Sequence, residues 1–265
     1  SVKDVIDMLN QPIERISNTD DFLTFNKEVE LNNVSYSYGK KNVLNHISFK
    51  IKKGAILGIV GETGSGKSTL ADLLMGLIQP NSGFISVDGI QIYNKENKSK
   101  LQKWRNKIAH IPQNIFLADA SVSENIAFGI ETKEINFDRV VKAAKISRIH
   151  DFIQNELGGY DKFVGEKGIN LSGGQLQRIG IARALYKKSN FLVMDEATSA
   201  MDENTERKII ESIYKLKNRP TIIMIAHRLS TLKNCDQIIH IHSGEIIDIG
   251  KPKEILGNIS ENYNF

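Results

Sequence analysis

Hydrophobic and polar positions alternate in the first part of the chain, as they do in strands with one buried face. The alternation runs through residues 29–38 and 43–51, and Gly39-Lys40-Lys41-Asn42 between them predicts a turn. Residues 55–60 form an apolar run bounded by glycines, which is typical of a strand buried on both faces. Further strands are predicted in two apolar runs, a strand-and-turn region and a hairpin around Ser243-Gly244, at residues 191–197, 221–227, 84–93 and 237–250.

Helical patterns lie between these strands. The predicted helices cover residues 69–78, 121–157 and 173–187, with a last helix from residue 251. The alternation of strands and helices predicts an α/β fold. We expect an antiparallel β subdomain early in the chain and an inserted α-helical subdomain over about residues 114–187.

The N-terminal segment has a helical pattern of its own. Apolar residues in 1–16 recur at spacings of four and three, but Pro12 should end the helix near Asn10. One interpretation is a helix packed on its own domain; the other is the cytoplasmic end of a helix whose upstream part is missing. The chain begins with Ser1 rather than Met, which indicates a processed or excised piece.

Composition narrows the class of protein. The 265 residues are 40% hydrophobic and 25% charged, which is typical of a globular protein. The 35 basic and 31 acidic residues are spread along the chain, so no basic block supports nucleic-acid binding. Cys235 is the single cysteine, which excludes an internal disulfide. No apolar run approaches the roughly 18 residues of a membrane span, so we expect no direct membrane insertion by this segment.

A phosphate-binding loop is predicted between the strand at 55–60 and the following helix. Gly61-Glu62-Thr63-Gly64-Ser65-Gly66-Lys67-Ser68 matches G-x-x-x-x-G-K-[ST] in the strand–helix context that this motif requires. Its glycines let backbone N–H groups surround phosphate oxygens, and the helix N-terminus adds positive partial charge. Lys67 would reach the β- and γ-phosphates, and Ser68 would bind Mg²⁺. The sequence therefore predicts ATP or GTP binding, and with it a P-loop NTPase core.

Two carboxylates follow the apolar run at 191–194. Asp195 and Glu196 lie where parallel strands deliver their ligand-binding groups. Asp195 would hold Mg²⁺ through a water. Because side chains alternate along a strand, Glu196 should point to the other side and accept a proton from the attacking water. The alternative is a pair of solvated turn carboxylates.

The string Leu171-Ser172-Gly173-Gly174-Gln175 opens the helix at 173–187. Alone it could be a helix cap with Ser172 as N-cap. Together with the two nucleotide motifs, in this order, it resembles the signature of the ATP-binding cassette (ABC) ATPases over residues 29–250. The resemblance implies that the string binds the γ-phosphate of ATP held by a second copy, so that two ATP molecules are sandwiched in a head-to-tail homodimer.

The resemblance assigns further residues. Tyr38 matches the aromatic residue that stacks on adenine, with Tyr36 as the neighbouring candidate. Gln113 matches the glutamine that contacts Mg²⁺ and the reacting water. His227 matches the histidine that contacts the γ-phosphate and holds Glu196. Asp202 lies in the loop that crosses to the opposing site, where Met201 replaces the usual Leu.

The full set of implied site residues is then as follows. Catalytic roles fall to Glu196, His227 and Gln113, and Mg²⁺ would be held by Ser68, Gln113 and Asp195. ATP would contact Tyr38, Gly61, Glu62, Thr63, Gly64, Ser65, Gly66, Lys67, Ser68, Thr69, Ser172, Gly173, Gly174, Gln175 and Asp202.

An exporter type is indicated by residues 163–168. They resemble the V-G-E-R-G loop of exporter cassettes and depart from it at Lys167. We therefore expect residues 1–25 to be a helix stub and linker following a missing transmembrane domain, and 26–265 to be the ABC ATPase domain. The implied function is ATP hydrolysis that powers transport or flipping of a substrate, with a lipid or lipid-linked oligosaccharide as the first candidate. The domain would work with its own transmembrane domain at the cytoplasmic face of the inner membrane.

Two other classes stay open. One is a soluble ABC ATPase acting on nucleic acid or in translation, although such proteins usually carry insertions or a second cassette. The other is a regulator that uses ATP only to dimerise, and the Glu196–His227 pair disfavours it. The isolated domain is expected to be monomeric without ATP.

Overall fold

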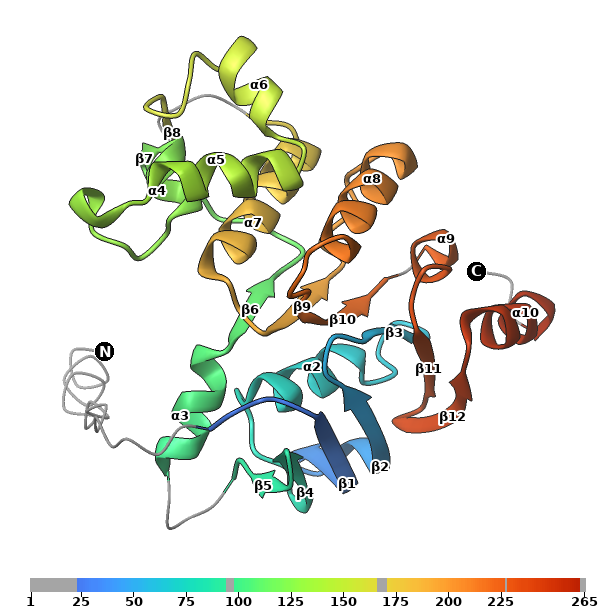
Figure 1. Ribbon diagram of the computed structural model, residues 1–265. Helices are drawn as coiled ribbons and strands as arrows, with labels where there is room; N and C mark the ends of the chain where they lie inside the picture. The colour runs from blue at the N-terminus through green and yellow to red at the C-terminus, as the bar shows by residue number, and fades with distance from the viewer. Residues whose placement is uncertain (1–22, 94–97, 166–170, 227, 263–265) are drawn as a thin grey trace, which may run out of the picture.

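The computed structural model describes residues 23–93, 98–165, 171–226 and 228–262 (Figure 1). The N-terminal helix predicted within residues 1–16 lies outside the described residues. Within them, no helix is both long and apolar enough to cross a lipid bilayer.

A six-stranded sheet forms the centre of the molecule. Its strand order is β12-β11-β3-β10-β9-β6, and every neighbouring pair is parallel except β11 with β12. The strands are β3 (Ile56–Val60), β6 (Ile108–Ile111), β9 (Phe191–Asp195), β10 (Thr221–Ile225), β11 (Gln237–His242) and β12 (Glu245–Gly250). All five residues of both β3 and β10 are buried, as expected for strands covered on both faces.

The two faces of this sheet belong to two hydrophobic cores, because side chains alternate along each strand. Leu57, Val193 and Ile223 pack with α2 (Lys67–Met75) and the antiparallel subdomain. Leu192 and Ile222 pack on the opposite face. Helices that contribute to this second core are α7 (Gly173–Lys187), α8 (Glu203–Tyr214), α9 (Leu229–Leu232) and α10 (Pro252–Asn262). The result is a layered α/β core of the P-loop type, which confirms the predicted fold class.

The antiparallel subdomain has the strand order β2-β1-β4-β5. Its strands are β1 (Glu28–Tyr38), β2 (Lys41–Lys52), β4 (Ser82–Val87) and β5 (Ile90–Gln91). The turn predicted over residues 39–42 is shorter than expected. Only Gly39 and Lys40 form it, because Tyr38 already pairs with Lys41 and Ser37 with Asn42.

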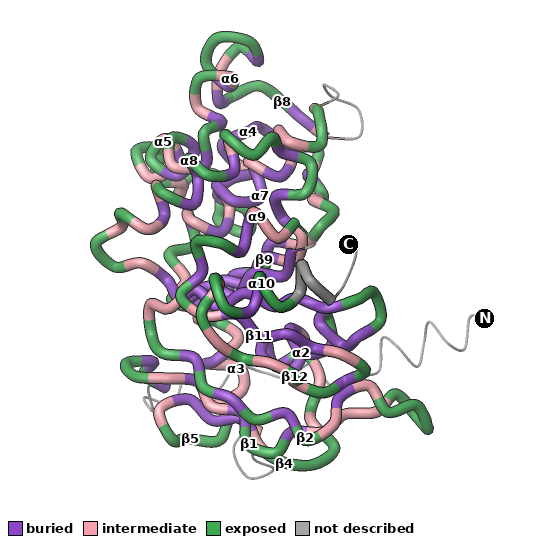
Figure 2. Tube along the Cα trace, turned by 90° about the vertical axis from the view of Figure 1, so that its right-hand side faces the viewer, coloured by how far each residue is buried: buried purple, intermediate pink, exposed green. Residues whose placement is uncertain are grey.

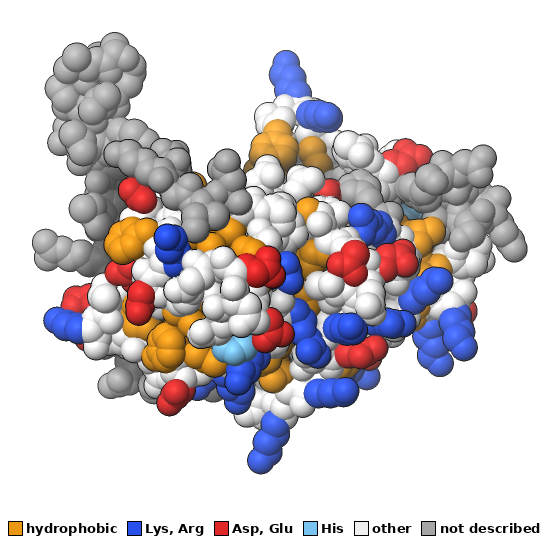
Figure 3. Space-filling view, turned by 90° about the horizontal axis from the view of Figure 1, so that it is seen from above, with side chains coloured by type: hydrophobic (Ala, Val, Ile, Leu, Met, Phe, Trp, Pro, Cys, Tyr) orange, Lys and Arg blue, Asp and Glu red, His pale blue; other side chains and the backbone are white. Residues whose placement is uncertain are grey.

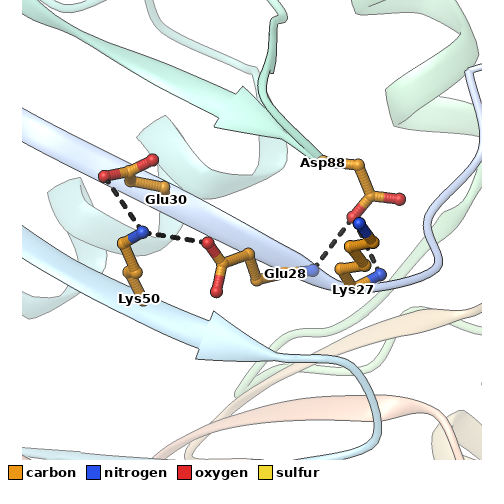
Figure 4. Close-up of polar contacts among 5 residues, drawn as sticks. All are labelled: Lys27, Glu28, Glu30, Lys50 and Asp88. Atoms are coloured by element: carbon orange, nitrogen blue, oxygen red, sulfur yellow. Dashed lines mark hydrogen bonds and ion pairs between the residues drawn. The ribbon is translucent and has the colours of Figure 1, made fainter.

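Polar contacts fix the entry into this subdomain (Figure 4). The carboxylate of Asp88, between β4 and β5, accepts hydrogen bonds from the backbone N–H groups of Lys27 and Glu28 at 2.8 and 2.9 Å. It also accepts one from the N–H of Asn26 at 2.6 Å. On the neighbouring strand, Lys50 Nζ lies 3.0 Å from Glu28 Oε1 and forms a longer ion pair with Glu30. The start of β1 is therefore held by the β4–β5 turn as well as by its own ladder.

The helical subdomain lies above the sheet in Figure 1 and has its own core, visible as buried tube in Figure 2. The prediction for 173–187 is confirmed, since α7 spans these residues. The prediction of a helical stretch over 121–157 is correct only in part. Asn136 caps a new helix and Ser147 ends it, so the stretch divides into short pieces: α4 (Val122–Ile126), η1 (Thr132–Glu134), α5 (Phe137–Ile146) and α6 (His150–Asn155), flanked by β7 (Ala120–Ser121) and β8 (Phe163–Val164).

Helix α3 (Lys98–Asn106) was not predicted, and its main apolar anchor is one fully buried side chain. Trp104 is fully buried between Phe25 and Phe191, and its indole N–H donates to the carbonyl oxygen of Leu74 at 2.7 Å. Leu101 packs partly buried against the same core, and the other residues of the helix are polar, so hydrophobic periodicity gives little signal there.

Candidate functional site

The phosphate loop joins β3 to α2, and glycine shapes it. Gly66 has φ 107° and is the residue before the helix. A Cβ on Gly66 would lie 2.7 Å from Leu44 Cδ2 and 3.0 Å from the carbonyl oxygen of Val43. Backbone conformation and packing therefore both require glycine at this position. The helix begins at Lys67, two residues earlier than predicted.

Lys67 folds back over this loop. Its Nζ donates to the carbonyl oxygens of Gly61 and Glu62, both at 2.7 Å, and the side chain is buried. Burial lowers the pKa of the ammonium group, while the negative charges of Glu196 and Asp195 act in the opposite direction. The lysine is thus a positive group held beside the loop and close to both predicted carboxylates.

The loop fits a phosphate group. The hydroxyl of Ser65 is buried and has no hydrogen-bond partner among the described residues. A buried polar atom without a protein partner is uncommon, and a bound ligand, ion or water supplies the missing hydrogen bond. Ser68 and Thr69 follow on the first turn of α2, with Ser68 exposed and Thr69 buried.

Asp195 ends β9, while Glu196 stands outside the strand. Glu196 has φ 50°, and its backbone N–H donates to the carbonyl oxygen of Ile225 at 3.0 Å. Strand alternation therefore does not set the direction of the Glu196 side chain, because this residue follows the end of β9 and has a left-handed backbone. A non-glycine residue with this backbone conformation is uncommon and is found preferentially at functional sites.

Gln113 meets Glu196 although 83 residues separate them. The Nε2 atom of Gln113 donates to Glu196 Oε2 at 2.8 Å, which fixes the carboxylate. Mg²⁺ usually binds one or two carboxylates plus substrate phosphates. Asp195, the Ser68 hydroxyl and the Gln113 amide oxygen, which the sequence analysis assigned to Mg²⁺, carry oxygen donors of the kind that such an ion takes.

The β1–β2 hairpin lies against the phosphate loop. The backbone N–H of Asn45 donates to Gly244 O, and the N–H of Gly244 donates to Ser65 O, at 2.8 and 3.1 Å. Tyr38, at the end of this hairpin, is 51% exposed, and its ring meets that of Tyr36 edge-on at 4.9 Å. Tyr36 is partly buried in the adjacent core, so Tyr38 offers the ring face that is open for stacking.

The signature string begins α7 as a capping box. Ser172 Oγ accepts from the N–H of Gln175, and the Gln175 side chain accepts from the N–H of Ser172. A Cβ on Gly173 would lie 3.1 Å from Ala200 Cβ, and one on Gly174 would lie 3.0 Å from Ala200 O. The string therefore packs on the loop after β9, and Ser172 itself is exposed.

Two residues that the sequence analysis missed hold this loop. The amide of Gln177 donates to Glu196 O and Ser199 Oγ at 3.3 and 3.1 Å and accepts from Ala200 N–H at 3.0 Å. Arg228 donates to the carbonyl oxygens of Ser199 and Met201 at 2.9 and 2.8 Å. Gln177 lies on the buried face of α7. A glutamine at an otherwise apolar helical position was therefore the signal that the sequence offered.

Glu206 and Asp202 complete the support of the loop. The buried carboxylate of Glu206 accepts from the hydroxyls of Thr198 and Thr231 at 2.5 and 2.8 Å. Asp202 caps α8 by accepting from the N–H of Thr205 at 2.9 Å, and this backbone bond lowers the pKa of its carboxyl. The predictions for His227 and for residues 166–168 lie outside the described residues.

Comparisons with known proteins identify the family. A sequence model described as ABC transporter matches residues 44–199. The leukotoxin translocation ATP-binding protein LktB of Pasteurella haemolytica-like sp. (strain 5943B) is 39% identical over 268 residues, covering 100% of this chain and 37% of that protein. LktB of Mannheimia glucosida is also 39% identical with the same coverage. A solved structure of a bacterial Atm1-family ABC exporter with ATP bound has a TM-score of 0.84 at 33% identity, covering 97% of this chain and 45% of that chain.

The fold and the site define a P-loop nucleotide-binding domain. The chain belongs to the ABC transporter family, whose ATP-binding domains are ATPases coupled to transport. It is similar to members of the exporter type, as the sequence resemblance indicated. It spans about 37% of the length of the curated relatives.

Proposed function

We propose that this chain is the ATP-hydrolysing domain of an ABC exporter, and that two copies close head to tail around two ATP molecules. The contact between Gln113 and Glu196 beside Lys67 carries the proposal. It supports a carboxylate held in place next to a phosphate loop, which is the arrangement that a general base needs.

The chemistry assigned to this chain is positioning and proton transfer. Lys67 exchanges its two carbonyl partners for phosphate oxygens, and the loop N–H groups bind the remaining charge. Glu196 accepts the proton of the attacking water while Gln113 keeps its carboxylate oriented. Mg²⁺, when bound, neutralises negative charge on the phosphates. Ser172 of a second copy would complete the γ-phosphate site from an exposed helix N-terminus.

The γ-phosphate determines whether the pair of domains is open or closed. The contact between Ser172 of the second copy and the γ-phosphate exists only in the closed pair, so ATP favours closure and hydrolysis releases it. The opening and closing of the pair would be transmitted to the transmembrane domain. We place the domain at the cytoplasmic face of the inner membrane, joined to its own transmembrane domain.

Exposed hydrophobic side chains support such a partner. Phe116 and Phe163 are 64% and 61% exposed, and Figure 3 shows hydrophobic side chains among charged ones on the helical end of the molecule. Phe116 follows Gln113 by three residues, so the candidate contact surface is next to the hydrolysis site.

For the substrate, we propose a lipid or lipid-linked oligosaccharide, the first candidate that the resemblance to exporter cassettes implies. A polypeptide is the second candidate, because the relatives are leukotoxin translocation proteins. ATPase assays of the full-length transporter in vesicles separate the two: stimulation by the lipid-linked sugar alone supports the first, and stimulation by an unfolded polypeptide alone supports the second.

Hydrolysis of Mg-ATP by the wild type and by Glu196→Gln, with the mass of each followed in solution, tests the catalytic proposal. We expect the variant to lose about 10²–10⁴-fold in rate and to form an ATP-dependent dimer. Turnover at the wild-type rate would remove Glu196 as the base. If the wild type binds ATP without turnover, the assay is repeated on the full-length transporter in lipid.

A further inference from the structure

A cavity of about 880 Å³ lies away from the phosphate loop. Its walls are α5, the C-terminal end of α7 and the segments that precede β3, β9 and β10, including Gly54, Asn190 and Pro220. The phosphate loop follows the other end of β3. The cavity therefore opens at the N-terminal ends of the parallel strands. The length of the five-residue strand β3, about 16 Å, separates it from the phosphate loop.

The lining of this cavity is basic. It contains six Lys or Arg side chains and no Asp or Glu: Lys53, Arg139, Lys142, Lys188, Lys217 and Arg219. Only Arg219 has an ion-pair partner among the described residues, Asp236 at 3.3 Å. Like charges gathered without counterions raise the local potential, and a bound anion lowers it.

Two polar atoms of the lining residues also lack hydrogen-bond partners among the described residues. Arg139 Nε and Ser189 Oγ are buried, and neither has a hydrogen-bond partner within the part of the chain that the structure describes. The guanidinium of Arg139 is held in place, because it stacks 4.3 Å from the centroid of the Tyr186 ring and donates to the Tyr186 carbonyl oxygen. A ligand, ion or water in the cavity would supply the partners that these two atoms lack.

The rest of the lining is apolar. Ala143 and Ile146 of α5 face Ala184 and Leu185 of α7, and Leu192 of β9 is buried beside them. Cavities of this volume with an apolar lining and a few converging polar groups are typical of small-molecule sites.

We propose that this cavity binds an amphiphilic phosphate ester, a small molecule with a phosphate group on an apolar body. The phosphate lies among the lysines and Arg139, and the body packs on the aliphatic lining. Because Lys142 comes from α5 whereas Lys53 and Lys217 come from segments that flank the sheet, the bound ligand joins the helical subdomain to the core.

Titration calorimetry with 1-naphthyl phosphate tests the site. The variants are Lys142→Glu and Lys217→Glu, and the matched control is Lys145→Glu, which reverses the same charge on α5 outside the cavity lining. We expect the affinity to fall about tenfold in the first two and to stay unchanged in the control. Any binding at the phosphate loop is common to all variants, so the difference between them reports the cavity.

Two further probes define the ligand class. Pyrophosphate lacks the apolar body and 1-naphthol lacks the charge, so the binding that Lys142→Glu weakens should be at least about tenfold weaker for both than for 1-naphthyl phosphate. Pyrophosphate binding that is equally strong and equally weakened by Lys142→Glu, or equal loss of 1-naphthyl phosphate affinity in Lys142→Glu and Lys145→Glu, would overturn the proposal.

The source of the phosphate ester is decided by a vesicle experiment. Co-sedimentation with phosphatidylcholine vesicles is compared with and without phosphatidic acid, using the same three variants. Lysine-dependent binding to the acidic vesicles supports a lipid headgroup, and binding of the soluble probe alone supports a free phosphate ester. Absence of lysine-dependent binding to either probe would refute the site.

Discussion

At the scale of single residues, two glycines of the phosphate loop differ in what surrounds them. Gly66 and Gly64 both have left-handed φ angles, but a Cβ on Gly64 would meet nothing within 4 Å. Gly64→Ala should therefore cost only about 1–2 kcal/mol of stability from backbone strain. Gly66→Ala adds the collision with Leu44 and Val43, so we expect a larger loss together with loss of ATP binding. Chemical unfolding and nucleotide titration measure both effects, and equal behaviour of the two variants would contradict the packing argument.

Gln177 offers a second prediction at this scale. Gln177→Met keeps the side-chain volume but removes three hydrogen bonds to the loop that carries Glu196. We expect the free energy of unfolding to fall by about 1–3 kcal/mol and kcat by about tenfold, with little change in KM. The split between kcat and KM distinguishes positioning of the base from a merely structural role. A variant that loses stability but keeps kcat would show that the loop does not orient Glu196.

Individual residues also show where sequence reasoning reached its limit. The phosphate loop, Asp195 and Glu196 could be predicted because each motif is local and its chemistry follows from residue type. The left-handed backbone of Glu196 could not, because it depends on the hydrogen bond to Ile225 in another strand. Gln177 and Arg228 escaped notice for the same reason: their partners lie 19 to 29 residues away in the chain.

At the scale of elements, Asp88 joins the β4–β5 turn to the start of β1. Burial alone would raise the pKa of this carboxyl. Hydrogen bonds from the backbone N–H groups of Asn26, Glu28 and Lys27 lower it by more, so the pKa in the folded protein is below its usual value. A depressed pKa gives stability that is complete above the unfolded value, about 3.9, and is lost as the pH falls through the folded value.

We therefore expect Asp88→Asn to lower the free energy of unfolding by about 1 kcal/mol at pH 7, because the amide N–H₂ cannot accept the bond that one carboxylate oxygen accepts. The difference from the wild type should shrink below pH 4, where the carboxyl takes up a proton. Urea unfolding at a series of pH values measures it. A difference that is independent of pH would exclude the ionised carboxylate as the cause.

Elements marked by a sequence motif were predicted well, whereas others without such a mark were overlooked. Residues 173–187 begin with a capping box and form one helix as expected. Helix α8 was overlooked although Glu206, Ile209 and Ile213 recur on its buried face at helical spacing, and strand β6 was overlooked because it has only four residues. The pairing of β6 with β9 is what makes it a strand, and no local pattern records that contact.

At the scale of the whole molecule, the proposed closed pair makes each ATP site from two chains. Lys67 lies in the phosphate loop of one copy, whereas Ser172 would serve the site of the other. Lys67→Ala and Ser172→Arg should therefore each abolish hydrolysis when tested alone. In a mixed pair, the Ser172→Arg chain supplies an intact phosphate loop and the Lys67→Ala chain supplies an intact signature string, so one complete site forms.

An equimolar mixture should then regain up to about a quarter of the wild-type activity, since half of the pairs are mixed and each has one working site of two. A coupled phosphate-release assay on the separate and mixed variants measures this. The matched control is a mixture of Lys67→Ala with Glu196→Gln. Both substitutions fall on residues that serve the ATP bound by their own chain, so no pair contains a complete site and the mixture should remain inactive. Recovery in the control as well would indicate that the sites are not shared in the proposed way. A head-to-tail closure predicts recovery only where the two defects fall on opposite sides of the interface, because only then does one site receive both of its intact halves.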